Sequence, residues 1–194
     1  SVLALSKARA LMMALEQPIL IAFIARLSEA KLNLAAFGIA GSFAMIIEAP
    51  VIMLMSASTA LVTGRHSYKK LRRFTDILNL GVTGIQLIIL IPPVFRFIVI
   101  TLMGVPEEVA RLAHIALLIF LPWAASIGYR RFYQGILIRN NLTRRVTYGT
   151  MVRLTVIVTV GLILYSAGVK GAYVGAGAMS LAVFTEAIAT RIMA

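Results

Sequence analysis

Long apolar stretches follow one another along the chain, and the charged residues collect in the short segments between them. A helix of about 20 apolar residues is long enough to cross the hydrocarbon core of a bilayer. Six stretches reach that length, covering residues 9–27, 36–64, 77–102, 109–138, 146–167 and 171–193. The third of them is interrupted by Pro92 and Pro93.

These stretches are predicted to be helices. Backbone donors and acceptors cannot stay unpaired in lipid, and the chain lacks the alternating ten-residue pattern of a membrane barrel. The pattern therefore predicts an all-α polytopic membrane protein. Residues 1–194 are expected to form a single bundle of six transmembrane helices.

Composition supports this interpretation. The chain has 194 residues, of which 60% are hydrophobic, and its mean hydropathy is +0.94. A soluble domain of this length has no core large enough to bury so much apolar sequence. The sequence contains no cysteine, which excludes disulfides and thiolate metal sites.

The basic residues predict an orientation, because Lys and Arg accumulate in short cytoplasmic loops. One set of loops would hold Lys7, Arg65, Lys69, Lys70, Arg72, Arg73, Arg139, Arg144, Arg145 and Arg191. The other set would hold Glu29, Lys31, Glu107, Glu108, Arg111 and Lys170. We therefore predict a multi-pass protein of the cell membrane with both termini of this segment in the cytoplasm. The basic residues flank spans and form no single soluble face, so no nucleic-acid partner is expected.

Several ionisable or polar residues fall inside the predicted spans, where a charge costs at least a few kcal/mol. They are Glu16, Gln17, Glu48, His114, Arg130, Arg131, Arg153 and Glu186. At about 1.5 Å per residue, Arg131 and Arg153 would each lie roughly 13 Å from the cytoplasmic edge. Four helices thus bring charges to a similar depth, which predicts an Arg-rich polar cavity open to the cytoplasm. The alternative is that these charges form buried ion pairs that only tie helices together.

Glu48 is followed by Ala49 and Pro50. A proline within a span frees a backbone carbonyl and bends the helix, so this carboxylate is a candidate proton or cation site. Ser56, Thr59 and Thr63 continue along one face at helical spacing, with Ser58 beside them, and a role for these hydroxyls in helix packing is at least as good an interpretation. His114 alone is weak evidence for a ligand site, since a hydrogen-bonded buried histidine is the more common case. Two histidines without cysteine do not supply a metal site. No hydrolase, nucleotide-binding or kinase motif occurs, so we predict no enzyme activity.

The order of these features resembles one lobe of the MATE-type (multidrug/oligosaccharidyl-lipid/polysaccharide) exporter superfamily, and within it the progressive ankylosis (ANKH-type) family. The resemblance rests on Glu16-Gln17 and on residues 34–41, 48–50, 121–123, 130–139, 169–177 and 185–186. It covers nearly the whole chain, although its motifs are short and mostly apolar. The features resemble the N-terminal lobe more than the C-terminal one.

The resemblance implies a secondary active transporter that works by alternating access. Its cargo would be an exported organic or phosphorylated anion, such as a nucleotide, citrate or pyrophosphate, or a lipid-linked anionic substrate that it flips. Substrate binding is expected at Arg130, Arg131, Gln134, Arg153 and Gln17. Coupling to H⁺ or Na⁺ is expected at Glu48, Glu16 and Glu186, with no other cofactor.

Members of this superfamily carry two lobes, and this chain supplies one. Its expected partners are therefore membrane lipid, the solute, and a second six-helix lobe that is either a covalent C-terminal half or the other copy in a homodimer. One alternative function is a non-transporting membrane interaction or scaffold protein whose buried charges are structural. A membrane-embedded enzyme is a third reading.

Overall fold

The computed structural model describes the backbone of residues 2–194, and side chains from Leu11 onward except Met13. Lys7 was expected on the cytoplasmic side, and its side chain lies outside the residues whose side chains are described. The chain is all-α, with no strand among residues 2–194. Its helices are α1 (Val2–Ala25), α2 (Ala30–Ile52), α3 (Leu54–Leu61), α4 (Arg65–Leu90), α5 (Pro92–Arg96), the π-helix η1 (Phe97–Leu102), α6 (Glu107–Ile119), α7 (Leu121–Arg139), α8 (Thr143–Ser166) and α9 (Gly171–Met193).

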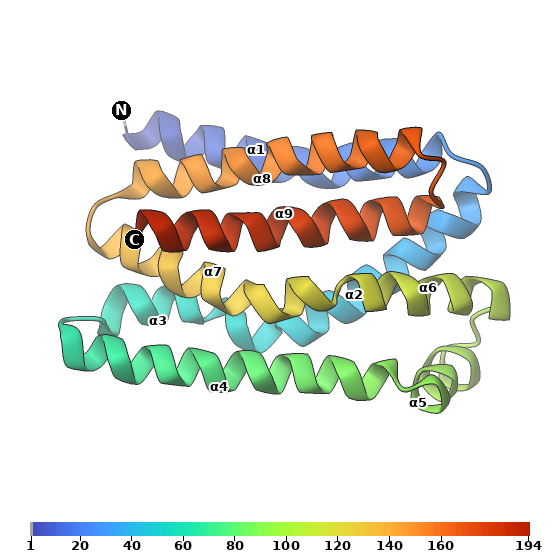
Figure 1. Cartoon of the computed structure of the whole chain (residues 1–194), viewed down its shortest axis with the longest axis horizontal. Helices are drawn as coiled ribbons and strands as arrows, with labels where there is room; N and C mark the ends of the chain where they lie inside the picture. Colours follow the sequence, from blue (N-terminus) through green and yellow to red (C-terminus); the bar gives the residue numbers. More distant parts are fainter. Residues whose placement is uncertain (1) are drawn as a thin grey trace.

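The long helices lie side by side in one bundle (Figure 1). Helix α9 packs on α8 and α7, α7 packs on α4, and α1 packs on α8. The two chain ends lie at the same end of the bundle as the α3–α4 and α7–α8 connections (Figure 1). We call this the basic end, because its exposed residues include Arg65, Lys69, Lys70, Arg73, Arg139, Arg144, Arg145 and Arg191.

Two of the long units are interrupted along their length. Pro50 lies inside α2 and has no N–H to donate to the carbonyl of the preceding turn, and α2 gives way to α3 at Met53. Helices α6 and α7 meet at Phe120 with a bend of 44°, and Pro122 lies in the first turn of α7. The halves match, since α2 packs on α6 and α3 packs on α7.

The third predicted stretch, 77–102, is corrected by the structure. Helix α4 begins earlier, at Arg65, because the Ser67 hydroxyl accepts hydrogen bonds from the backbone N–H groups of Thr63 and Gly64 at 3.0 Å each. Such a cap satisfies donors that a helix start leaves free. The helix ends at Leu90, where Ile91 is extended and the two prolines start a separate short helix. Residues 92–102 are therefore not a continuation of this span.

Length and apolar composition qualify four helices of the described chain to cross a membrane, and the bent α6–α7 pair makes a fifth. Large apolar side chains such as Met45, Leu80 and Ile163 are exposed on the outside of the bundle. A soluble monomer rarely exposes so large an apolar surface, which agrees with a polytopic membrane protein. The sixth crossing, by α1, stays a prediction.

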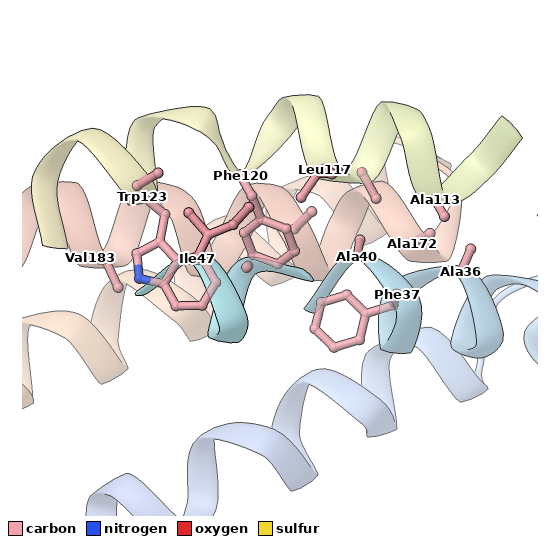
Figure 2. Packing of buried hydrophobic residues seen from close by; sticks show 14 of the residues in the cluster. Ala36, Phe37, Ala40, Ile47, Ala113, Leu117, Phe120, Trp123, Ala172 and Val183 are labelled. Atoms are coloured by element: carbon pink, nitrogen blue, oxygen red, sulfur yellow. The ribbon is translucent and has the colours of Figure 1, made fainter. Parts of the chain in front are cut away.

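The core is built on small residues of α9. A Cβ at Gly171 would meet Ile24 and Asn33, and one at Gly175 would meet Phe37 and Ile24. These glycines let α9 approach α1 and α2 closely. Between α2 and the α6–α7 bend, the side chains of Phe37, Phe120 and Trp123 pack together (Figure 2).

Candidate functional site

Four helices bring charged side chains together in the bundle interior. Glu186 of α9 lies at the centre, where its carboxylate accepts a hydrogen bond from Arg130 Nη1 at 2.9 Å and another from Gln134 Nε2 at 3.0 Å. Arg153 of α8 lies with its Nε 3.4 Å from Glu186 Oε2, and its Nη2 donates to Glu16 Oε1 of α1. The result is a chain of ion pairs in the order Glu16, Arg153, Glu186, Arg130, which we call the ion-pair chain.

Helix geometry explains how the ion-pair chain is assembled. Arg130 and Gln134 lie four residues apart and so project from the same face of α7. Gly149 precedes Arg153 by one turn of α8, and a Cβ at Gly149 would come 3.1 Å from Thr190 and 3.6 Å from Glu186. The glycine therefore leaves room for α9 to bring Glu186 up against α8.

The ion-pair chain is almost fully buried and electrically balanced. Each of its charged side chains is 6% exposed or less. Removing a charge from water is costly unless it is paired and hydrogen-bonded, and here two arginines oppose two glutamates. This pairing lets four charges occupy the middle of an apolar bundle.

A second ion pair joins α2 to α7. Arg131 Nη2 lies 3.3 Å from Glu48 Oε1, and the two side chains are 17% and 12% exposed. Arg130 and Arg131 are consecutive, so α7 directs one arginine toward α9 and the next toward α2. Glu48 lies one turn before the break between α2 and α3.

Some polar atoms at this site have no hydrogen-bond partner within the described residues. They include Nε of Arg130 and of Arg131, and Oε1 of Gln134. A buried polar atom without a partner costs about 1–3 kcal/mol. The site therefore retains hydrogen-bonding capacity that its protein contacts do not use.

Gln17 points away from its neighbour Glu16. Whereas Glu16 is buried in the ion-pair chain, Gln17 is exposed and lines a groove of about 460 Å³ between α1 and α2. Gly38 and Gly41 also line this groove, and no atom lies within 4 Å of where a Cβ of either would be. We call it the α1–α2 groove. Its floor includes Trp123 and Met179.

The structure thus distributes the predicted site residues over three places. Glu16, Arg130, Gln134, Arg153 and Glu186 meet in the ion-pair chain, Glu48 and Arg131 form a separate pair, and Gln17 faces a groove. The excess of positive charge expected from the three deep arginines disappears once Glu48 is counted with them. Their roles in substrate binding and coupling stay predictions.

Other polar residues noted in the sequence have packing contacts. His114 Nε2 lies 2.7 Å from the Leu90 carbonyl, and its ring packs against Phe95. The Ser58 hydroxyl donates to the Leu54 carbonyl, and Thr59 donates to the Gly135 carbonyl at 3.2 Å. The His114 and Thr59 contacts link helices, whereas the Ser58 hydrogen bond lies within α3.

One charged cluster was missed by sequence reasoning. The Arg72 guanidinium lies 5.3 Å from the ring centre of Tyr129 and 5.6 Å from that of Tyr133, and it donates to the Tyr133 hydroxyl. It also pairs with Asp76 at 3.3 Å. Arg72 was expected in a loop, but the i, i+4 spacing of Tyr129 and Tyr133 could have indicated a shared face of α7.

Comparison with known proteins places these features in a family. A family model described as MatE matches residues 8–164, which is most of the chain. No curated protein and no solved structure matches this chain. The match includes most of α1, all of α2 to α7 and most of α8, and hence every residue of the ion-pair chain except Glu186.

Proposed function

Because this chain belongs to the MatE family of membrane transporters, we propose that it forms one lobe, the N-terminal one, of a secondary active exporter that works by alternating access. The α1–α2 groove would bind part of the solute, and the ion-pair chain would couple transport to an ion. The observation that carries this proposal is the position of Glu16 and Gln17. Consecutive residues of α1 contact the ion-pair chain on one side and line the groove on the other.

Glu16 is the carboxylate best suited to exchange a proton. It has one ion-pair partner, Arg153, whereas Glu186 contacts Arg130, Gln134 and Arg153. Neutralising Glu16 therefore breaks one contact and leaves Arg153 paired with Glu186. Pro18 follows within the same helix and has no N–H to bond the preceding turn. A change at Glu16 thus acts on a segment of α1 that already lacks a helical hydrogen bond.

The proposed cargo is an organic or phosphorylated anion, and the basic end supports it. Exposed arginines and lysines gather there, and the chain carries a formal net charge of +12. Such a field raises the local concentration of anions at low salt. The deep arginines add little to this argument, because each of them faces a glutamate.

The test is transport by the whole protein in sealed vesicles under an imposed pH gradient. Pyrophosphate and citrate are the anionic probes, and tetraphenylphosphonium is the cationic one. Glu16→Gln should abolish the dependence of anion flux on the pH gradient while the protein stays folded. Glu108→Gln is the matched control, since Glu108 is exposed at the opposite end and should leave flux unchanged. Flux of the cation with none of the anions would contradict the proposed substrate class.

A second candidate function has a specific observation in its favour. A non-transporting membrane interaction protein would keep its deep charges paired and buried, as the ion-pair chain is. The same vesicle experiment separates the two functions. If the folded protein transports neither anion nor cation under any gradient, the result supports the membrane interaction function and contradicts the transport function.

A further inference from the structure

A second groove opens on the other side of α7, at the basic-end half of the bundle. It has a volume of about 390 Å³, and α7 contributes much of its lining, with α4 on one side and α9 on the other. Its lining includes Arg72 of α4, Tyr129 and Tyr133 of α7, and Phe184, Ile188 and Arg191 of α9. We call it the α4–α9 groove. It shares no residue with the α1–α2 groove.

The lining changes from apolar to cationic toward the basic end. Along α9 it runs from Phe184 through Ile188 to Arg191, two residues before the helix ends. Along α7 it runs from Pro122 to the hydroxyl of Tyr133, six residues before the helix ends at Arg139. In a membrane, this gradient follows the change from acyl chains to headgroups within one leaflet.

The cationic part of the groove is held in place before any ligand arrives. Contacts with Asp76 and the Tyr133 hydroxyl, and the two tyrosine rings, fix the Arg72 guanidinium, yet its side chain remains 29% exposed. An arginine fixed in this way loses little conformational freedom on binding a phosphate. Arg191 brings a second positive charge and Asp76 removes one, so these groups leave a net positive charge.

We propose that the α4–α9 groove binds an anionic phospholipid, with its phosphate at Arg72 and Arg191 and an acyl chain along Phe184 and Ile188. Arginine recognises phosphate through paired N–H groups, and the apolar length of the groove gives an acyl chain a surface to cover. A free phosphate would leave that apolar length unused. An apolar partner helix would cover the groove but would give the guanidinium of Arg191 no acceptor. This site is independent of the proposed transport function.

Native mass spectrometry of the whole protein in detergent tests the proposal. It would be titrated with phosphatidylglycerol or phosphatidylcholine carrying the same acyl chains. The unmodified protein should bind phosphatidylglycerol more tightly than phosphatidylcholine. The double variant Arg72→Gln/Arg191→Gln should lose about tenfold in affinity for it, which corresponds to about 1.4 kcal/mol, and should lose the preference over phosphatidylcholine.

The matched control removes two positive charges from the same end at residues outside the groove. Lys69→Gln/Arg144→Gln should retain the preference for phosphatidylglycerol, since both residues are exposed and neither lines the groove. Equal losses of phosphatidylglycerol affinity in the two double variants would show that the effect comes from general surface charge, and the proposed site would then be wrong. The single variant Arg191→Gln, at an exposed residue, provides the same test if the Arg72 variant fails to fold.

Two further measurements distinguish the occupant. Glycerol phosphate at millimolar concentration should not displace phosphatidylglycerol, because it has no acyl chain, and displacement would show a site for a soluble phosphate instead. The protein should bind lipid without a change in its own stoichiometry. If the groove variants instead convert a dimer to a monomer, the groove is an interface between copies and the lipid proposal is wrong.

Discussion

Two sides of α7 contact arginines in opposite circumstances, one of them its own Arg130 and the other Arg72 of α4. Arg130 is buried in the ion-pair chain and contacts a carboxylate that two other side chains also contact. On the side toward α4, Tyr129 and Tyr133 hold Arg72, whose contacts with them are mainly aromatic and whose side chain remains reachable. The difference follows from burial. In the ion-pair chain, burial requires that positive and negative charges balance, whereas the partly exposed position of Arg72 permits an excess of positive charge.

The largest expected effect comes from removing the centre of the ion-pair chain. Glu186→Leu should lower the free energy of unfolding by about 3–5 kcal/mol, because it leaves Arg130 buried without a carboxylate. Asp76→Leu, the corresponding change beside Arg72, should cost less than about 1 kcal/mol, since that pair is partly exposed. Denaturant titration in detergent, followed by circular dichroism, measures both. Equal costs would remove the distinction between the two sides.

The next test asks whether the ion-pair chain and the Glu48–Arg131 pair are separate units. Glu16→Gln and Arg153→Gln should be non-additive by about 0.5–3 kcal/mol, because their side chains contact each other. Glu16→Gln and Glu48→Gln should add to within about 0.5 kcal/mol, because they share no partner. Double-mutant cycles on unfolding free energies provide both numbers. Strong coupling in the second cycle would mean that a change at one of the two sites alters the other through α7.

The smallest expected effect is at the Tyr133 hydroxyl. Tyr133→Phe removes one hydrogen bond to Arg72 but keeps the ring, so the cost should be about 0.5–1.5 kcal/mol. Tyr148→Phe is the control, because Tyr148 is exposed on α8 and should change stability little. A larger loss at Tyr133 than at Glu186 would reverse the comparison.

The sequence was sufficient for the helical class and for finding charged residues that lie inside the bundle. A charge within a long apolar stretch is expected to face away from lipid, and Glu16, Arg130, Arg153 and Glu186 are indeed buried. The pairing could not be read in this way, because Arg130 and Glu186 are 56 residues apart and depth does not say which helices are neighbours. The pairing of Arg131 with Glu48, which balances the deep charge, was missed for this reason.

Helix boundaries show a similar limit. Pro50 lies close to the point where α2 gives way to α3, and the sequence could indicate an interruption there because the missing N–H is a property of the residue itself. The start of α4 at Arg65 was missed, because basic residues at a membrane edge read as a loop although Ser67 supplies a cap. The 44° bend at Phe120 was also not predicted.

The matched breaks in α2–α3 and α6–α7 have a mechanical consequence. Arg139 donates to the carbonyls of Thr59 and Ala60 at 2.8 and 3.2 Å, and a Cβ at Gly135 would collide with Ser58. Helices α3 and α7 are therefore fixed to each other beyond both breaks. Arg130 and Gln134 fix the same part of α7 to Glu186 of α9. The part of the bundle beyond Met53 and Phe120 is thus tied together across helices, and we expect it to respond as one body to a change at any of these contacts.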